Sequence, residues 1–347
     1  MDEELVKLLI DANKQLAKLD TASQLISNAD LFISMYVRKE ALISSQIEGT
    51  QCTLDDVLDP EVEKNANLDV SDVINYVKAT QYALNRLKEL PLCCRLIREI
   101  HEVLMDGVRG QDKTPGEFRC SQNWIGPANC ALKEARYIPP NVEDMQNAMM
   151  DLEKYINENT DYDPLIRVAL IHYQFETIHP FLDGNGRIGR LLILLYLMEQ
   201  GLLKKPVIYI SYFLKKNQIE YYDRISEVRR SGNFEQWIRF FLEAVSKAAS
   251  DSLEAINRLS TLHDTNVQRL PKTNRSKDNL RAVFDYIEQY PIIDIKRTAK
   301  ELEISYNTVA TAVKKLVEFG ILQETTNAAR NRVFAYEGYL EILRKDT

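Results

Sequence analysis

The sequence is poor in the residues that interrupt regular structure, with only 12 glycines and 11 prolines in 347 residues. All-β proteins need turn residues at short, regular intervals. This scarcity therefore argues against an all-β fold and favours helices joined by short loops. Hydrophobic residues make up 45% and charged residues 27% of the chain, which excludes a protein that is disordered throughout or fibrous. A working domain length of about 150 residues predicts two or three domains.

The sequence also lacks the marks of a membrane, secreted or zinc-stabilised protein. Its longest apolar run, Leu191–Met198, is far shorter than the roughly 18–20 residues that span a bilayer. It begins with the acidic stretch MDEELVKLLI, which does not resemble a secretory signal. Its five cysteines form no CxxC pair, so we expect free thiols. These absences predict a cytoplasmic protein with no membrane partner.

The chain has no excess of positive charge. It carries 44 Lys and Arg against 51 Asp and Glu, for a net charge of -7. A protein that coats nucleic acid over its whole surface is basic. That class is excluded, whereas a local nucleic-acid site is not.

Apolar residues recur at helical spacing along most of the chain, so the expected fold class is mainly α. The least helical stretch runs from 107 to 140, where Gly and Pro cluster. We expect a helical bundle followed by a small separate domain. The predicted boundaries are 1–90 for an N-terminal helical region, 91–260 for a core, 261–278 for a polar linker and 279–347 for the last domain.

The stretch most informative about chemistry is HPFLDGNGRIGR, residues 179–190, which lies between two helical patterns. Its Gly-Asn-Gly triplet tolerates unusual backbone angles and directly precedes a helix. The free amides and the dipole of a helix start make an anion site. Arg187 and Arg190 lie on one face of that helix, and two guanidinium groups there indicate a phosphate chain.

Two more side chains complete the set that phosphoryl or nucleotidyl transfer requires. Asp183 is a carboxylate just outside the helix, which suits Mg²⁺ shared with phosphates. His179 can take a proton near neutral pH. Each feature alone has a plainer interpretation as a turn, a helix cap or a structural histidine, and only the joint pattern favours catalysis. The stretch is neither a P-loop nor a dinucleotide fingerprint.

The same stretch matches the motif HPFx(D/E)GNGRxxR of the Fic family at every specified position, and the chain resembles that family over roughly residues 30–260. The segments PGEFR, WIG and ARYIPP before the motif, and KKNQIEYYDRI after it, also resemble Fic proteins. The resemblance implies a helical bundle with a short β-hairpin flap. It implies transfer of AMP from ATP to a Ser, Thr or Tyr hydroxyl of a target protein, or of the chain itself.

The resemblance assigns a role to each motif residue. His179 is the base that deprotonates the hydroxyl, and Asp183 holds Mg²⁺ between the α- and β-phosphates. Asn185 lies near the α-phosphate, Arg187 binds the β-phosphate and Arg190 binds the γ-phosphate, while Phe181 anchors the loop in the core. The other residues expected at ATP are Gly184, Gly186, Ile188, Gly189, Tyr137, Ile138, Tyr221 and Tyr222. For the last two, core packing is an equal alternative.

The ARYIPP stretch at 135–140 resembles the flap of Fic proteins, whose strand edge aligns the target chain by main-chain bonds. We expect the target protein to dock there. The related Doc-like phosphotransferases have Lys in place of Gly186 and lack the arginine that corresponds to Arg190. Both residues are present here, which favours AMP transfer. Another nucleotide or a different diphosphate donor stays open.

An inhibitory motif precedes the core. Ser44 to Gly49, SSQIEG, fits the (S/T)xxxE(G/N) pattern of Fic proteins, on a helix expected over about 32–49. The resemblance implies that Glu48, with Ser44, pairs with Arg190 and denies it to the γ-phosphate, because Arg–carboxylate and Arg–phosphate pairing compete. The plainer alternative is an acidic surface residue. Removal of AMP from targets is a further alternative.

The last domain has the order helix, helix, turn, helix and then two short strands around 327–331, which is typical of a winged helix. Residues 305–319 resemble a recognition helix. DNA binding needs phosphate contacts from cations, here Lys314, Lys315, Arg330 and Arg332. The alternatives are protein contact or dimerisation, and a homodimer is expected because similar proteins are commonly dimers.

The second function class is therefore a transcriptional regulator with a degenerate, nucleotide-sensing Fic core. The intact His179, Asp183 and both motif arginines argue against a degenerate core.

Overall fold

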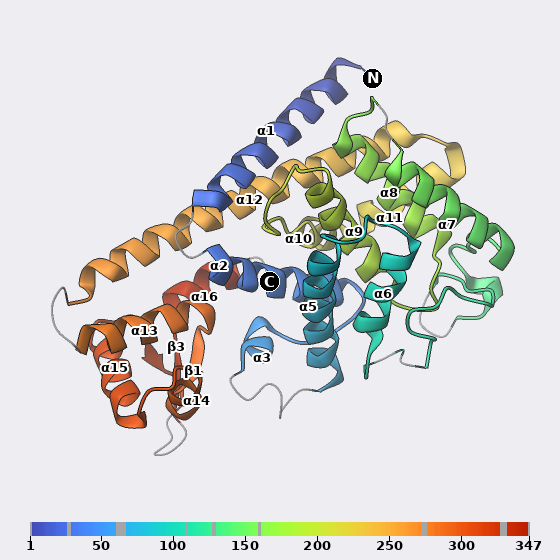
Figure 1. Cartoon of the computed structure of the whole chain (residues 1–347). Helices are drawn as coiled ribbons and strands as arrows, with labels where there is room; N and C mark the ends of the chain where they lie inside the picture. Colours follow the sequence, from blue (N-terminus) through green and yellow to red (C-terminus); the bar gives the residue numbers. More distant parts are fainter. Residues whose placement is uncertain are drawn as a thin grey trace.

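The computed structural model describes residues 2–25, 29–59, 67–108, 110, 112–126, 130–158, 161–271, 276–326 and 332–345. Within them the chain is mainly helical, as predicted, and its one sheet is small, antiparallel and near the C-terminus (Figure 1). No helix in these ranges is long and apolar enough to cross a membrane.

The longest helices form one edge of the molecule. α1 (Glu3–Leu25) and α12 (Phe234–Arg269) lie side by side along the diagonal of Figure 1. Leu5, Ala12, Leu16 and Leu19 recur at helical spacing in α1 and are buried, so one apolar stripe holds this helix against the rest of the chain.

The helices that surround the motif are short to medium in length. They are α2 (Ala29–Ile47), α3 (Leu54–Leu58), α5 (Leu68–Arg86), α6 (Cys94–Met105), α7 (Val142–Asn157), α8 (Pro164–Ile178), α9 (Asn185–Glu199), α10 (Ser211–Lys216) and α11 (Gln218–Ser231), with the 3₁₀ turn η1 (Leu132–Glu134). α9 is central, as predicted, because every residue from Arg187 to Leu197 is buried. Asp163 caps the start of α8, and Pro164 occupies its first turn.

The described part of the C-terminal unit, residues 276–326 and 332–345, forms four helices and three strands. They are α13 (Ser276–Gln289), β1 (Ile292–Asp294), α14 (Ile295–Glu301), α15 (Tyr306–Glu318), β2 (Gln323–Glu324), β3 (Val333–Ala335) and α16 (Glu337–Arg344). β3 lies between β1 and β2, with Ile292 and Gln323 both opposite Ala335. Ser305 caps α15 as predicted. Sequence analysis missed β1 and α16, and the predicted turn at 327–331 lies outside the described residues.

The prediction of a polar linker over 261–278 is wrong at both ends, because α12 continues to Arg269 and α13 begins at Ser276. Two inward positions of this last part of α12, His263 and Asn266, are polar and interrupt the apolar pattern, although Leu262 and Val267 also pack against the core. The His263 imidazole lies 2.7 Å from Glu288 Oε1. The Asn266 side-chain amide donates to the Tyr336 hydroxyl at 2.6 Å. These two polar pairs, together with the apolar contacts of Leu262 and Val267, join the end of α12 to the C-terminal unit.

The C-terminal unit rests on α2 (Figure 1). The Lys39 ammonium on α2 is buried and donates to the Lys345 carbonyl at 2.6 Å. The Arg344 guanidinium makes two hydrogen bonds, of 3.0 and 2.9 Å, to the Asp55 carboxylate. The helix that carries the predicted inhibitory motif therefore contacts this unit directly.

Candidate active site

The predicted catalytic loop, residues 179–184, connects two core helices. α8 ends at Ile178, and the next residue, His179, adopts a left-handed conformation with φ 52°. Pro180 prevents the helix from continuing. Gly184, with φ 76°, starts α9 without a Cβ penalty. A left-handed histidine is costly, so the loop must be held by other contacts.

Asn185 supplies two of those contacts. Its Oδ1 accepts from the Phe181 amide at 2.9 Å, and its Nδ2 donates to the Phe181 carbonyl at 2.8 Å. The side chain is 2% exposed. Both polar atoms are therefore used to shape the loop rather than directed at the place predicted for the α-phosphate. Phe181 is fully buried, in agreement with its predicted anchoring role.

His101 is a site residue that sequence analysis missed. Its ring stacks on Phe181 with centroids 3.7 Å apart. Its Nδ1 accepts from the Gly116 amide at 2.9 Å, which leaves the proton on Nε2 to be donated to the Asp183 carbonyl at 3.1 Å. Burial lowers its pKa to about 4, so the ring is neutral. In the sequence, His101 is marked only as a polar residue on the apolar face of the helix that becomes α6.

Arg119, from the PGEFR segment, joins the loop to the flap. Its Nε donates to the His179 carbonyl at 3.1 Å, and its backbone amide donates to the Pro180 carbonyl at 2.9 Å. Its Nη2 donates to the Pro140 carbonyl at the end of the flap. The side chain is fully buried. One guanidinium thus fixes the backbone of the predicted base relative to the flap.

The His179 imidazole has one nitrogen, Nδ1, that is buried without a hydrogen-bond partner among the described residues. Burial lowers its pKa to about 4, the Glu48 carboxylate acts in the opposite direction, and the Arg229 guanidinium adds to the lowering. The ring is therefore neutral at physiological pH, which is the form that accepts a proton.

Arg187 and Arg190 both point inward from α9 and are buried. Arg187 is held loosely: Nη1 lies 3.9 Å from Asp72 Oδ1, and Nη2 lies 3.8 Å from Asp183 Oδ1. Its Nε has no hydrogen-bond partner among the described residues. Burial raises the pKa of Asp72 to about 6. Sequence analysis missed Asp72, because nothing local marks this residue of α5 as a neighbour of the motif.

Arg190 is held tightly by the end of α2. Its Nε donates to Ser44 Oγ at 2.8 Å, and its Nη2 donates to the Ser44 carbonyl at 2.9 Å and to Glu48 Oε1 at 2.7 Å. A Cβ added to Gly186 would collide with Glu48 Oε1. The Glu48 carboxylate therefore lies against the start of α9, where an anion would bind. The predicted pairing of Glu48 with Arg190 is present.

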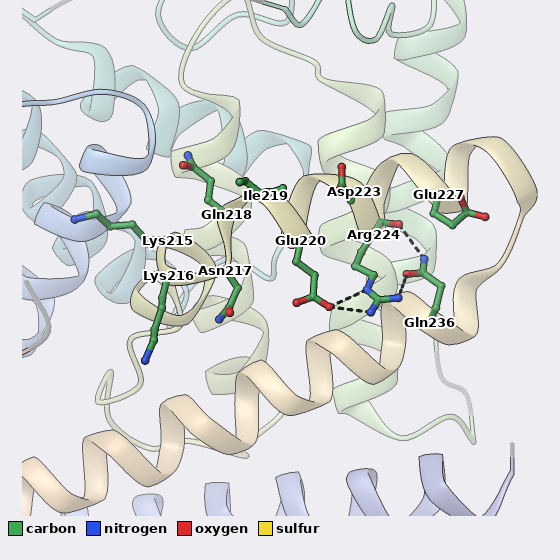
Figure 2. Close-up of a pocket in the computed structure, with 10 residues that line it drawn as sticks. All are labelled: Lys215, Lys216, Asn217, Gln218, Ile219, Glu220, Asp223, Arg224, Glu227 and Gln236. Carbon is green, nitrogen blue, oxygen red and sulfur yellow. Dashed lines mark hydrogen bonds and ion pairs between the residues drawn. The ribbon is translucent and has the colours of Figure 1, made fainter.

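The turn between α10 and α11 holds the end of α2 in this position. Lys215 Nζ donates to Gln46 Oε1 at 2.6 Å, and Gln218 Nε2 donates to the Ile47 carbonyl at 3.3 Å. Figure 2 shows both side chains at the rim of a surface pocket on α11, where Arg224 bridges Glu220 and Gln236. This pocket does not contain the motif residues.

Three residues predicted at ATP instead pack in the core. Ile188 and Tyr221 are each 1% exposed. The Tyr221 hydroxyl lies 2.8 Å from His172 Nε2, and Gly189 is buried against Glu176 and Phe175. Their side chains and Cα atoms have no surface for a ligand here, so for Tyr221 the core alternative describes the structure.

Of the other residues predicted at ATP, Tyr222 and Ile138 are exposed, Tyr137 and Gly186 are half-buried, and Gly184 is buried. Tyr222 is 42% exposed, and burial of its hydroxyl raises its pKa to about 12, so it stays protonated. Ile138 on the flap is 52% exposed. Tyr137 forms an isolated antiparallel bridge with Ile125, whose amide donates to the Tyr137 carbonyl at 2.9 Å. The flap is thus a single bridge rather than a full hairpin among the described residues.

Two family models match this architecture. The model "Fic/DOC family N-terminal" matches residues 6–85, and the model "Fic/DOC family" matches residues 91–197. Together they cover more than half of the chain, including α2 and the whole motif. The chain belongs to the Fic/DOC family.

Relatives and solved structures of the Fic/DOC family agree. The chain is 30% identical over 203 residues to "Protein adenylyltransferase Fic" of Aedes aegypti and to that of Culex quinquefasciatus, in each case over 57% of this chain and 36% of the relative. It is 28% identical over 190 residues to that of Drosophila erecta, covering 53% of this chain and 33% of the relative. The chain spans about a third of the length of these curated relatives.

Solved Fic structures share the fold. A Fic family protein from Desulfovibrio desulfuricans G20 has a TM-score of 0.61 at 18% identity, with 97% of this chain and 96% of that chain covered. A Fic domain containing signaling protein from Bacteroides thetaiotaomicron has a TM-score of 0.58 at 20% identity, over 72% of this chain and 97% of its own.

Proposed function

We propose that this Fic protein is a protein adenylyltransferase, which transfers AMP from ATP to a hydroxyl of a target protein and is inhibited by α2. The observation that carries the proposal is the Glu48–Arg190 pair, which sits across an intact motif at the start of α9. A carboxylate can inhibit through this pair only if Arg190 would otherwise bind the substrate. The names of the curated relatives, "Protein adenylyltransferase Fic", support the same reaction.

The motif residues suit this transfer. The neutral His179 imidazole takes the proton of the incoming hydroxyl, whose oxygen then attacks the α-phosphorus of ATP. The bond from that phosphorus to the bridging oxygen breaks, and pyrophosphate leaves. The amides at the start of α9 and the Arg187 guanidinium stabilise the charge that develops on the phosphate oxygens. Arg119 and Asn185 hold the loop backbone in place for this step.

Asp183 is the residue that would hold Mg²⁺. Its side chain is 46% exposed and lies beside Arg187 at the start of α9. The described residues contain no group of three or more His, Cys, Asp or Glu side chains placed to bind a metal. A single carboxylate fits an ion whose other ligands are phosphate oxygens and water. When bound, Mg²⁺ would neutralise charge on the phosphates.

Inhibition follows from competition for one guanidinium. Arg190 gives two nitrogens to Ser44 and Glu48 and its side chain is 1% exposed. A γ-phosphate needs the same donors, and its negative charge is repelled by the Glu48 carboxylate. ATP then binds only without its γ-phosphate contact, in an unproductive pose.

The experiment is label transfer from ATP to protein with Mg²⁺, using α-labelled and γ-labelled ATP in parallel. Wild type, Glu48→Gly and Glu48→Gly/His179→Ala are compared, with cell lysate as a source of targets. We expect label from the α-phosphate only, strongest in Glu48→Gly and absent without His179. The matched control is Glu220→Gly, which removes a nearby carboxylate that pairs with Arg224 instead.

Two results would contradict the proposal. Label from the γ-phosphate would mean a kinase-like orientation of ATP. If Glu48→Gly is no more active than wild type, the inhibitory role of α2 is wrong even though the pair exists.

DNA binding by the C-terminal unit is a second candidate function. It is favoured by the exposed polar face of α15, which presents Tyr306, Asn307, Thr311 and Lys314. Lys314 is within 4.0 Å of Glu318, and Arg332 is within 3.5 Å of Glu324, which weakens the electrostatic case. A gel shift with genomic fragments at several salt concentrations tests it, and no shift at low salt would reject it.

A further inference from the structure

Arg229, which lies outside the motifs, contacts both the flap and α8, the helix that directly precedes His179. It lies in the last turn of α11 and is half-buried. Its Nε donates to Thr177 Oγ1 at 3.2 Å, and its Nη2 donates to the Glu176 carbonyl at 3.0 Å. Its guanidinium carbon lies 3.6 Å from the centre of the Tyr137 ring.

Tyr137 completes the contact from the other side. Its hydroxyl donates to the Thr177 carbonyl at 2.9 Å. Glu176 and Thr177 belong to the last turn of α8, whose carbonyls have no partner within the helix. Arg229 and Tyr137 therefore cap two of these carbonyls, and a cation at a helix C-terminus is favourable. The capped turn is the one that leads directly into the strained His179.

These contacts make one unit of three separate elements. The flap, α11 and the end of α8 meet where Arg229 stacks on Tyr137. The backbone of the same Tyr137 forms the bridge to Ile125. Arg119 fixes the far end of the flap at Pro140. The flap is thus tied at two points to the backbone on either side of the base.

We propose that Arg229, with Tyr137, is a positioning residue for the transfer step, which sets the distance and angle between a protein acceptor docked on the flap and the His179 imidazole. This inference rests on the proposed function, because it presupposes that an acceptor chain docks on the flap. Arg229 touches neither substrate. It acts through Tyr137 and through the last turn of α8.

The test compares Arg229→Gln, Arg229→Lys and Tyr137→Phe in the Glu48→Gly background. Arg230→Gln is the matched control, since Arg230 is the next residue, loses the same charge, is 80% exposed and pairs only with Glu227 among the described residues. The acceptor is a His179→Ala copy of the chain together with cell lysate, and the donor is α-labelled ATP.

We expect Arg229→Gln to lower kcat/KM for the protein acceptor by about tenfold or more, because a displacement near 1 Å costs on the order of a hundredfold. In Arg229→Gln the KM for ATP stays unchanged, because the proposed phosphate site lies at the start of α9 and not on α11. Arg229→Lys restores part of the rate but not the stacking. Loss of the Arg229 charge also raises the pKa of His179, so the acid limb of the pH–rate profile moves to higher pH in Arg229→Gln and not in Arg229→Lys.

Hydrogen exchange gives a readout that needs no activity. The amides of Ile125 and Tyr137 form the flap bridge, and both exchange faster in Arg229→Gln than in Arg230→Gln if the pair holds the flap. Unchanged exchange overturns the inference, as does faster exchange with an unchanged KM and kcat for the acceptor. If no variant, including Glu48→Gly, transfers label, the proposed function fails, and faster exchange alone then supports the structural part of the inference.

Discussion

The surroundings of the two motif arginines differ sharply, although both residues lie on α9 one turn apart. Around Arg190, Ser44 on α2 and Glu48 just after this helix supply three acceptors at 2.7 to 2.9 Å. Around Arg187, the nearest carboxylate oxygens are 3.8 and 3.9 Å away. One guanidinium is therefore satisfied within the chain, and the other is poised between two carboxylates without a close hydrogen bond to either.

Under the proposed function, this difference locates the inhibition at Arg190 rather than at Arg187. The Arg187 region keeps its binding capacity for a ligand, whereas the Arg190 region is occupied by the protein itself. The proposed inhibition would therefore block one end of the phosphate chain and leave the other end and the base unchanged. Nucleotide affinity and catalytic rate should then respond separately to changes in the two regions.

The largest effect is expected on the Arg187 side. Arg187→Ala in the Glu48→Gly background removes a cation that faces the charge developing in the transition state, so transfer from α-labelled ATP should fall by about a hundredfold or more. Arg224→Ala, which removes a surface arginine paired with Glu220, is the control and should leave transfer unchanged. A comparable loss of transfer in Arg187→Ala and Arg224→Ala would show that Arg187 has no specific role in catalysis.

A second effect concerns Glu40, which lies on the same face of α2 as Ser44 and Glu48. Burial raises its pKa to about 7, although Ser211 donates to it and Arg190 acts to lower the value. The ionised form is thus disfavoured in the folded state, and stability is lost as pH rises from about 4.5 towards 7. Glu40→Gln should match wild type at pH 4 and be more stable at pH 8 by roughly 1–3 kcal/mol.

Thermal or urea unfolding of wild type and Glu40→Gln across this pH range measures the difference. If the variant is less stable than wild type by the same amount at both pH values, the Glu40 carboxyl contributes through hydrogen bonding alone and not through its titration.

The smallest effect is expected at Ser44. Ser44→Ala removes one of the three acceptors of Arg190 and keeps the carbonyl and Glu48, so the inhibited state should lose about 1 kcal/mol and basal transfer should rise about fivefold. Ser45→Ala is a close control, because Ser45 is equally buried and its Oγ has no hydrogen-bond partner among the described residues. Equal activation by both variants would mean that α2 is loosened in general, not at Arg190.

Sequence reasoning found the features that local patterns encode. The spacing of apolar residues predicted α9 as a central helix, and the fixed positions of HPFLDGNGRIGR identified the loop between α8 and α9. The short inhibitory motif predicted a pair between Glu48 and Arg190, residues 142 positions apart. That success came from the family resemblance, since no local rule connects those two residues.

Sequence reasoning missed what depends on distant polar groups meeting. His101 and Arg119 hold the loop, and Arg229 holds the last turn of α8, through hydrogen bonds to backbone carbonyls or amides. Such contacts leave no period in the sequence. The direction of the Asn185 side chain was missed for the same reason. The helical start of the supposed linker was missed because His263 and Asn266 occupy inward positions that the pattern reserves for apolar residues.

The loop's Asn185–Gly186 sequence has a consequence for the chemical ageing of the protein. Asparagine followed by glycine is prone to deamidation, in which the glycine nitrogen attacks the side-chain carbonyl carbon. Here both ends of the Asn185 amide are bonded to Phe181 and the following backbone is helical, which keeps that carbon away from the attacking nitrogen. Deamidation would replace the donating amide by a carboxylate facing the Phe181 carbonyl. The hydrogen bonds that shape the loop thus also protect it from slow self-modification.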